Sequence, residues 1–292
     1  MQMIHIPRRF WKKLTKTKIY NYLPDQWAVS IKYRNHFYKK LDLKNPQTFN
    51  EKLQWLKLYD RRPEYTRMVD KYLAKEYVAS IIGEEYIIPT LGVWKSFDEI
   101  DFDALPDQFV LKCNHGSGDV VICKDKKTLD IAAARKKLTA ALKQDYYLVS
   151  REWPYKNVNR VILAEQYLED VETQDARDYK FFCFDGKPEI LFVATERSTD
   201  CRFDFFDMDF RHLDIENIHP QSDRPIPRPA SFGQMNELAA RLSRGMKFVR
   251  IDLYEINGKV YFSEYTIYHA GGFWPMAPME WEYRLGDLIR ID

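Results

Sequence analysis

A short stretch of small residues stands where one predicted strand gives way to another. Lys112 ends the apolar run that begins at Phe109, and Cys113-Asn114-His115-Gly116-Ser117-Gly118 follows directly. Backbone N–H groups of small residues in such a loop can approach phosphate oxygens closely, and a lysine beside them supplies positive charge. The loop has neither the Lys-Ser/Thr ending of a P-loop nor the G-x-G-x-x-G spacing. Taken alone, it is better explained as an ordinary turn between strands.

Two carboxylates, Asp252 and Glu264, lie on either side of an Asn257-Gly258 turn signal. A two-residue turn would put them on opposite faces of a hairpin. A three-residue loop would instead set them diagonally on one face, close enough to share a metal ion. Paired carboxylates suit Mg²⁺, which takes one or two of them from a protein. The alternative is two solvated acids, which their apolar sequence neighbours make less favourable.

A lysine and a glutamate beside apolar runs are further candidates. Lys180 opens a strongly apolar stretch, where it either pairs with an anion or extends its stem to the surface, and the sequence favours neither. Glu165, with Gln166 and Leu168 after it, follows another apolar run. The chain there can offer a backbone donor and acceptor to an adenine edge, although in isolation an exposed strand end is the simpler explanation.

Asp207-Met208-Asp209 follows the apolar pair Phe205-Phe206. An Asp-x-Asp pattern can hold Mn²⁺ and the diphosphate of a nucleotide sugar. Such short acidic patterns also arise often by chance. A turn after the preceding strand explains this one equally well.

Hydrophobic periodicity predicts the elements that position these residues. Thr48 and Glu51 fit a capping box that opens a helix, and a second helix is expected after Arg62-Pro63, continuous as far as residue 78. Strands should flank the Gly/Ser loop, and hairpins are expected at Asp185-Gly186 and Asn257-Gly258. Helices followed by mixed strands and helices with antiparallel hairpins indicate an α+β fold.

Composition indicates a folded protein. The chain has 292 residues, 45% of them hydrophobic and 15% aromatic, which excludes a disordered or fibrous chain. No apolar run approaches the ~18 residues of a membrane span. The formal net charge is +2, but residues 1–40 carry +9 and the remainder −7. An acidic body argues against a broad nucleic-acid-binding face.

The basic N-terminal segment mixes cations with Ile4, Phe10, Trp11 and Leu14. As a helix it would have an apolar and a basic face, which either lies on an anionic membrane surface or packs on its own domain. No apolar leader is evident. The four cysteines show no metal spacing, so we expect reduced thiols in the cytosol.

Five stretches together resemble one known family, the TupA-like branch of the ATP-grasp superfamily, which is found in bacterial cell-surface polysaccharide gene clusters. They are residues 49–57 (FNEKLQWLK), 91–100 (LGVWKSFDEI), 111–118 (LKCNHGSG), 178–186 (DYKFFCFDG) and 249–254 (VRIDLY). The resemblance covers roughly residues 45–292 and implies two α+β lobes that hold a nucleotide between them, preceded by a helical N-terminal region. It divides the chain into an N-terminal arm (1–44), a helical region (45–95), a small lobe (96–164) and a large lobe (165–292).

The resemblance also implies roles for individual residues. Lys71 and Lys112 would bind the phosphates of ATP. A mobile loop of His115, Gly116, Ser117 and Gly118 would cover them. The adenine would lie against a hinge formed by Glu165, Gln166 and Leu168. Asp252 and Glu264 would hold Mg²⁺, and catalysis would involve Lys180 and Arg250 facing phosphate or a substrate anion, with His269 and Tyr265 on the acceptor side. Thr266 stands where many superfamily members have an asparagine ligand, so a complete two-metal site is not expected.

The function that the resemblance implies is an ATP- and Mg²⁺-dependent carboxylate–amine ligase. Its partners would be a carboxylate-bearing glycan or sugar nucleotide, in which a uronic acid reacts, and an amino acid or amine. It would work in the cytoplasm, with residues 1–20 near the inner face of the membrane. The alternatives are a glycosyltransferase that uses Asp207 and Asp209, an ATP-grasp sugar kinase, and a non-catalytic binding module.

Overall fold

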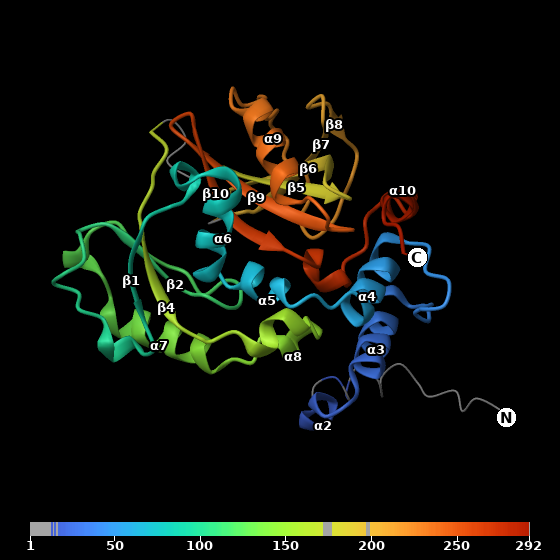
Figure 1. Cartoon of the computed structure of the whole chain (residues 1–292), viewed down its shortest axis with the longest axis horizontal. Coiled ribbons are helices and arrows are strands. Elements are labelled where there is room, and N and C mark those ends of the chain that lie inside the picture. Colours follow the sequence, from blue (N-terminus) through green and yellow to red (C-terminus); the bar gives the residue numbers. More distant parts are fainter. Residues whose placement is uncertain (1–12, 14, 16, 172–176, 197–198, 292) are drawn as a thin grey trace.

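Two antiparallel sheets with helices between and around them make up the protein (Figure 1). The computed structural model describes residues 13, 15, 17–171, 177–196 and 199–291. This architecture confirms the expected α+β fold with a helical N-terminal region.

The smaller sheet has four strands in the order β1-β4-β2-β3. Its strands are β1 (Thr90–Trp94), β2 (Phe109–Cys113), β3 (Val121–Cys123) and β4 (Ile162–Gln166). Helix α7 (Ile131–Lys143) begins where the Asp130 carboxylate accepts a hydrogen bond from the Ala133 N–H, and it packs Leu138 against Leu111. The sheet includes β1, which the sequence division places in the helical region, and β4 crosses the boundary at 164.

The larger sheet has six strands in the order β10-β9-β5-β6-β7-β8. Its strands are β5 (Arg177–Phe184), β6 (Lys187–Thr195), β7 (Arg202–Asp207), β8 (His212–Leu213), β9 (Val249–Ile256) and β10 (Lys259–Thr266). Both faces are covered, because Phe181 packs against Phe232 of α9 (Phe232–Leu242), whereas Phe182 packs against Phe49 of α4 (Phe49–Tyr59). The central strand β5 is therefore buried on both sides.

The remaining elements are helices and 3-10 turns. They are the helices α2 (Lys18–Asn21), α3 (Asp25–Phe37), α5 (Glu64–Val69), α6 (Leu73–Ile82), α8 (Tyr147–Ser150) and α10 (Glu280–Leu288), and the 3-10 turns η1 (Glu84–Tyr86), η2 (Phe97–Glu99), η3 (Lys126–Thr128), η4 (Trp153–Asn157) and η5 (His269–Gly272). Among the described residues, no helix combines the length and apolarity that crossing a bilayer demands.

The expected capping box opens α4. The Thr48 hydroxyl accepts from the Glu51 N–H at 3.4 Å, and the Glu51 carboxylate accepts from the Thr48 N–H at 3.1 Å. Because this motif needs only residues within one turn, its pattern is legible in the sequence.

The helix expected after Arg62-Pro63 is in fact two helices, so its predicted continuity was wrong. The chain breaks at Asp70, whose carboxylate accepts from the N–H groups of Tyr72 and Leu73 and so begins α6. At the break, the Lys71 N–H donates to the Asn114 carbonyl at 2.9 Å. A tertiary hydrogen bond thus replaces a helical one and turns Lys71 toward the Gly/Ser loop.

The described part of the N-terminal segment packs on the body. Ala28, Val29 and Tyr33 of α3 are buried, and the Asp25 carboxylate bonds Arg61 at 2.8 Å and lies 3.4 Å from Arg151. Residues 1–12, which carry Ile4, Phe10 and Trp11, and residue 14 lie outside the described residues.

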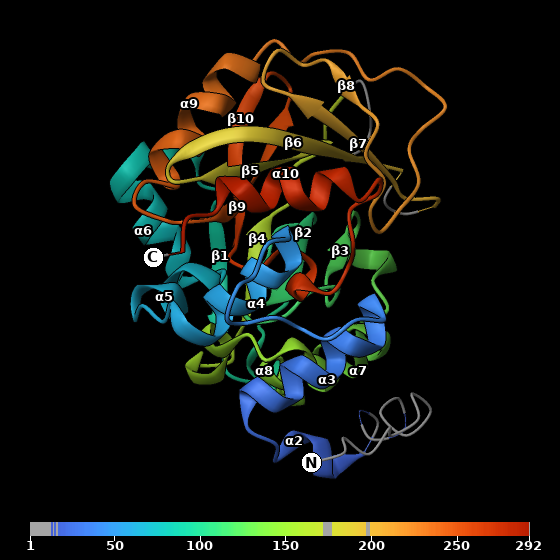
Figure 2. The ribbon, with the colours of Figure 1, turned by 90° about the vertical axis from the view of Figure 1, so that its right-hand side faces the viewer.

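A glycine in α10 permits close packing between that helix and the start of α4 (Figure 2). A methyl group at Gly286 would lie 2.2 Å from the Gln47 carbonyl oxygen and 3.0 Å from the Phe49 nitrogen, and both are backbone atoms. We expect Gly286→Ala to lower the free energy of unfolding by about 2 kcal/mol, because backbone cannot yield as a flexible side chain can. Urea unfolding followed by circular dichroism measures the change.

Gly233→Ala in α9 is the matched control. A methyl group there meets no atom within 4 Å, so the variant should be as stable as the wild type or slightly more stable. Equal losses in the two variants would contradict the packing argument.

Candidate active site

A cavity of about 610 Å³ lies at the junction of the Gly/Ser loop, the large sheet and the turn η5. Gly116 and Ser117 border it from the small sheet, and Lys180, Arg250 and Glu264 border it from the large one. The ammonium of Lys71 joins the two sides, since it donates to the Gly116 carbonyl at 2.6 Å and lies 3.5 Å from a Glu264 oxygen. Residues far apart in the chain therefore meet at this place.

Strand register concentrates charge on the large sheet beside the cavity. Lys180 of β5 lies opposite Asp252 of β9, and Glu264 of β10 lies opposite Asp252 on the other side. The hairpin has a two-residue turn, but a bulge between Phe262 and Glu264 shifts the register. Neither sequence-based arrangement was right: Glu264 faces Asp252 directly, not on the opposite face and not diagonally.

Asp252 is a fully buried carboxylate held by two cations. Arg250 donates from Nε and Nη2 at 2.7 Å each, and the Lys180 ammonium also bonds the carboxylate. Burial alone would raise the pKa of this carboxyl, but Arg250 and Lys180 outweigh burial and lower it to about 2. The side chain of Asp252 is 0% exposed, whereas that of Glu264 is 31% exposed.

Lys180 pairs with anions and does not extend its stem to the surface. Of the two alternatives that the sequence left open, the ion pair is therefore the one present. Its ammonium lies 2.6 Å from an Asp178 oxygen and also bonds Asp252. Burial lowers the pKa of Lys180, but the two carboxylates more than compensate and raise it above its usual value. Lys180 therefore stays charged at neutral pH.

His269 holds Arg250 in place. Its Nδ1 lies 2.9 Å from Arg250 Nη1 and its Nε2 lies 3.0 Å from the Asn217 amide oxygen. Burial, and then the charge of Arg250, lowers the pKa of the imidazole well below its usual value. A neutral ring that accepts from arginine at Nδ1 must carry its proton at Nε2, facing Asn217. His269 lines the cavity as a positioning residue for Arg250.

On the small sheet, Glu165 binds two lysines. Its carboxylate lies 2.5 Å from the Lys112 ammonium and 2.6 Å from that of Lys75, and burial, which would raise its pKa, is outweighed by these charges, which lower it. Lys75 was not foreseen. Its only signal is its place four residues after Lys71, which the expected continuous helix would have put on the same face.

The Gly/Ser loop contains two glycines with left-handed backbones, Gly116 at φ 105° and Gly118 at φ 86°. Both positions favour glycine over any residue with a side chain. The His115 side chain is buried at the end of α7, with Nε2 3.3 Å from the Gln144 carbonyl, and it does not border the cavity.

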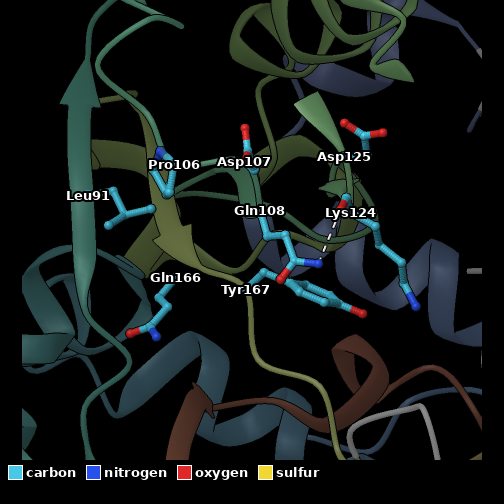
Figure 3. Close-up of a pocket in the computed structure, with 8 residues that line it drawn as sticks. All are labelled: Leu91, Pro106, Asp107, Gln108, Lys124, Asp125, Gln166 and Tyr167. Carbon is cyan, nitrogen blue, oxygen red and sulfur yellow. Dashed lines mark hydrogen bonds between the residues drawn. The ribbon is translucent and has the colours of Figure 1, made fainter. Parts of the chain in front are cut away.

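The residues expected to form the adenine hinge, at the end of β4 and just after it, lie in different surroundings. The Gln166 N–H already donates to the Pro89 carbonyl at 3.0 Å, and Leu168 is half-buried. The Gln166 side chain borders a different cavity, drawn in Figure 3, at the end of the small sheet where β2 begins and β4 ends, and there Gln108 donates to the Lys124 carbonyl. That cavity shares no residue with the charged cluster.

Tyr265 does not line the acceptor side, so that expectation was wrong. It is 2% exposed and its hydroxyl donates to the Leu242 carbonyl, because its position on β10 faces the core under α9.

Sequence reasoning also missed a buried lysine next to the cavity. The Lys57 ammonium donates to the carbonyls of Ser150 and Gly271 and to the Gln54 amide oxygen. It thereby ties α4 to η5, the turn that carries His269. Its only sequence signal is a lysine between Leu56 and Leu58 in an otherwise apolar stretch of helix.

Comparisons with known proteins give a match to a family model and likenesses to solved structures. The family model described as TupA-like ATP-grasp matches residues 51–290. Similar solved structures include the L-amino acid ligase from Bacillus licheniformis, with a TM-score of 0.46 at 13% identity over 85% of this chain and 56% of that one. D-alanine–D-alanine ligase from Helicobacter pylori has a TM-score of 0.43 at 15% identity, and the match covers 83% of this chain and 69% of that one.

D-alanine–D-alanine ligase from Bacillus anthracis, complexed with ATP, gives a TM-score of 0.39 at 17% identity, and the match covers 69% of this chain but only 54% of that one. A comparison with curated protein sequences gives no match.

The buried cluster should control stability as well as chemistry. We expect Asp252→Asn to lower the free energy of unfolding at pH 7 by about 3 kcal/mol, because it leaves Lys180 and Arg250 buried without their anion. Glu264→Gln, at a partly exposed carboxylate, should change it by less than about 1 kcal/mol. Thermal and urea unfolding measure both.

The same variant gives a pH test. Because the pKa of Asp252 is lower in the folded state, its contribution is complete above pH ~4 and declines as the pH falls toward about 2. The stability difference between wild type and Asp252→Asn should shrink over that range. A difference that stays constant from pH 5 to pH 2 would argue against a charged Asp252.

Proposed function

Because the chain belongs to the TupA-like ATP-grasp family, we propose that it is an ATP- and Mg²⁺-dependent carboxylate–amine ligase. The observation that carries the proposal is the charged cluster on one wall of the cavity. Lys71, Lys180 and Arg250 bring three cations together there, next to a partly exposed carboxylate, Glu264. Such a group neutralises the charge that develops on a transferred phosphoryl group.

The nucleotide would lie between the two sheets. We assign its phosphates to Lys71, Lys112 and the backbone of Gly116-Ser117-Gly118, where φ angles of 105° and 86° leave the glycine N–H groups uncovered by side chains. Lys112 would be positioned by its pair with Glu165. Since the Gln166 N–H is already bonded to Pro89, we assign the adenine donor to the backbone of Leu168.

We propose that Mg²⁺ binds at the carboxylates of positions 252 and 264, which requires Arg250 or Lys180 to release an oxygen of Asp252. The carboxylate oxygens are the hard ligands that this ion prefers, and the bulge in β10 sets the two residues directly opposite each other. Glu264 is the more accessible, whereas Asp252 lies under Arg250 and Lys180. The hydroxyl of Thr266 accepts from Arg250 Nη2 at 2.9 Å, which agrees with two protein ligands and no third. When bound, Mg²⁺ would neutralise phosphate charge.

The proposed reaction needs no protein nucleophile. A carboxylate oxygen of one substrate attacks the γ-phosphorus of ATP, and ADP leaves. The amine of the second substrate then attacks the acyl carbon, phosphate leaves, and the nitrogen loses a proton to give the amide. Lys180 and Arg250 would bind the transferred phosphoryl group and stabilise both steps.

We propose a sugar acid, the uronic acid of a cell-surface polysaccharide or its nucleotide precursor, as the carboxylate, and an amino acid or amine as the second substrate. The half-buried Phe203, which borders the cavity, supports a sugar because an aromatic ring can pack against the apolar face of one. The reaction would take place in the cytoplasm, and residues 1–20 would contact the inner face of the membrane.

The glycosyltransferase alternative draws no support from Asp207 and Asp209. The Asp207 carboxylate accepts from the N–H groups of Asp209 and Arg211, as expected of a turn, and Asp209 pairs with exposed Arg211. Neither acid borders the cavity. A sugar kinase would share the nucleotide site and is distinguished by its product.

Hydroxylamine tests the chemistry, because it converts an acyl phosphate to a coloured hydroxamate. We expect the wild type to form hydroxamate from glucuronate with Mg²⁺–ATP, releasing ADP and phosphate in equal amounts. Glu264→Gln should lower this rate at least about 100-fold. Asp209→Asn, the control that removes one exposed acid outside the cavity, should leave it unchanged.

Other outcomes are decisive as well. A phosphorylated sugar without hydroxamate would identify a kinase. Thermal stabilisation by UDP-glucose with Mn²⁺, absent with Mg²⁺–ATP and lost in Asp209→Asn, would overturn the ligase proposal.

A further inference from the structure

Helix α3 lies before the part of the chain that the family model matches, yet it forms one wall of the cavity. Lys32 and His36, one helical turn apart, both border it. The helix lies beside α8 (Figure 2) and is firmly attached, since Asp25 bonds Arg61 and Tyr147, and Lys32 donates to the Val149 carbonyl of α8. The N-terminal region therefore contributes side chains to the site.

Lys32 differs from the other lysines at the site in its partners. Lys75, Lys112 and Lys180 each pair with a carboxylate. Lys32 donates to the Val149 carbonyl at 2.6 Å and lies 4.6 Å from the centre of the Phe273 ring, but within the described chain no carboxylate is close enough to form an ion pair with it. Burial lowers the pKa of its ammonium, and the more distant Glu152 only partly compensates.

Glu152 acts on Lys32 from a distance and is not bonded to it. It is 7% exposed, accepts a hydrogen bond from the Ser150 hydroxyl, and acts electrostatically on Lys57 and Arg250 as well. Asp252 already pairs with Arg250, and burial lowers the pKa of Lys57 to about 7, so Lys32 is the charge at this end that an anionic ligand group would balance.

Lys32 and His36 also lie where two cavities meet. A second cavity of about 720 Å³ shares Lys32, His36 and Val149 with the first and continues along α3 past Asn35 and Tyr38. A ligand that extends from the first cavity into the second would pass beside these side chains. Its outer part would therefore lie within reach of the Lys32 ammonium.

We propose that Lys32 and His36 form an anion-recognition subsite for the acceptor substrate. The subsite would bind a carboxylate or phosphate that the acceptor carries in addition to its reacting group. The ammonium supplies a point charge, and the imidazole, one turn away, borders the same two cavities. Assignment to the acceptor rests on the proposed ligase function, whereas the anion site itself does not.

Thermal unfolding of the full chain without nucleotide tests the subsite with defined probes at matched ionic strength. The probes are glucuronate against glucose, L-glutamate against L-glutamine, and phosphate against chloride. We expect at least one anion to stabilise the protein more than its partner probe does. The pair that responds tells whether a sugar acid, an amino acid or a phosphate is preferred.

Variants of α3 decide whether Lys32 carries the effect. Lys32→Met keeps the buried stem and should raise the apparent Kd for the responding anion at least tenfold, whereas Lys32→Arg should largely retain binding. Arg34→Gln is the matched control, because this exposed residue of the same helix borders neither cavity. Circular dichroism and unfolding without probe check that each variant folds.

Several results would overturn the subsite: no anion preference, no loss in Lys32→Met, or an equal loss in Arg34→Gln. Mg²⁺–ATP is measured in parallel. Stabilisation by Mg²⁺–ATP with no anion effect would reject the subsite alone. An anion effect without stabilisation by Mg²⁺–ATP would reject the proposed function and retain the subsite.

Discussion

A carboxylate without exposed surface must find its counter-charges inside the protein, and at Asp252 this requirement organises the site. Arg250 and Lys180 bond both of its oxygens, which makes burial of the charge tolerable. Arg250 also bonds Thr266 and His269, so the network extends from the sheet into η5. The order β10-β9-β5 places Asp252 in the middle strand, with Glu264 and Lys180 on its two neighbours.

The two halves of the site meet through Lys71. The break at Asp70 exposes the Lys71 N–H to the Asn114 carbonyl, and the ammonium then contacts both the Gly116 carbonyl and Glu264. One residue of the helical region thus links the loop of the small sheet to a strand of the large one. A displacement of the loop would change the surroundings of Glu264, because both share this lysine.

The parts of the fold that depend on neighbouring residues could be predicted from the sequence. The capping box at Thr48 and the turn at Asn257-Gly258 are local motifs, and the structure contains both. The bulge between Phe262 and Glu264 depends on how β10 packs against β9, and the helix break at Asp70 depends on a hydrogen bond to a distant loop. No pattern within one segment of the sequence predicts the bulge or the helix break.

The candidate site residues also divide into those that local sequence identifies and those that only tertiary contacts identify. The motif residues were identified by type and order, but their partners were not. Lysines 32, 57 and 75 look like surface residues in the sequence, and only tertiary contacts bring them to the cavity or to Glu165. Tyr265, which the resemblance had put on the acceptor side, follows Glu264 on β10 and therefore faces away from the cavity into the core.

The two ends of the cavity are built from different kinds of structure. Strands at the centre of a hydrogen-bonded ladder supply Lys180, Arg250 and Glu264. Helices α3 and α8 supply the other end, and the turn η5 joins the two ends because its His269 bonds Arg250 of β9. The two ends thus differ in how they tolerate substitution: a new side chain on α3 leaves the ladder of β5, β9 and β10 intact, whereas one at Asp252 alters the middle of that ladder.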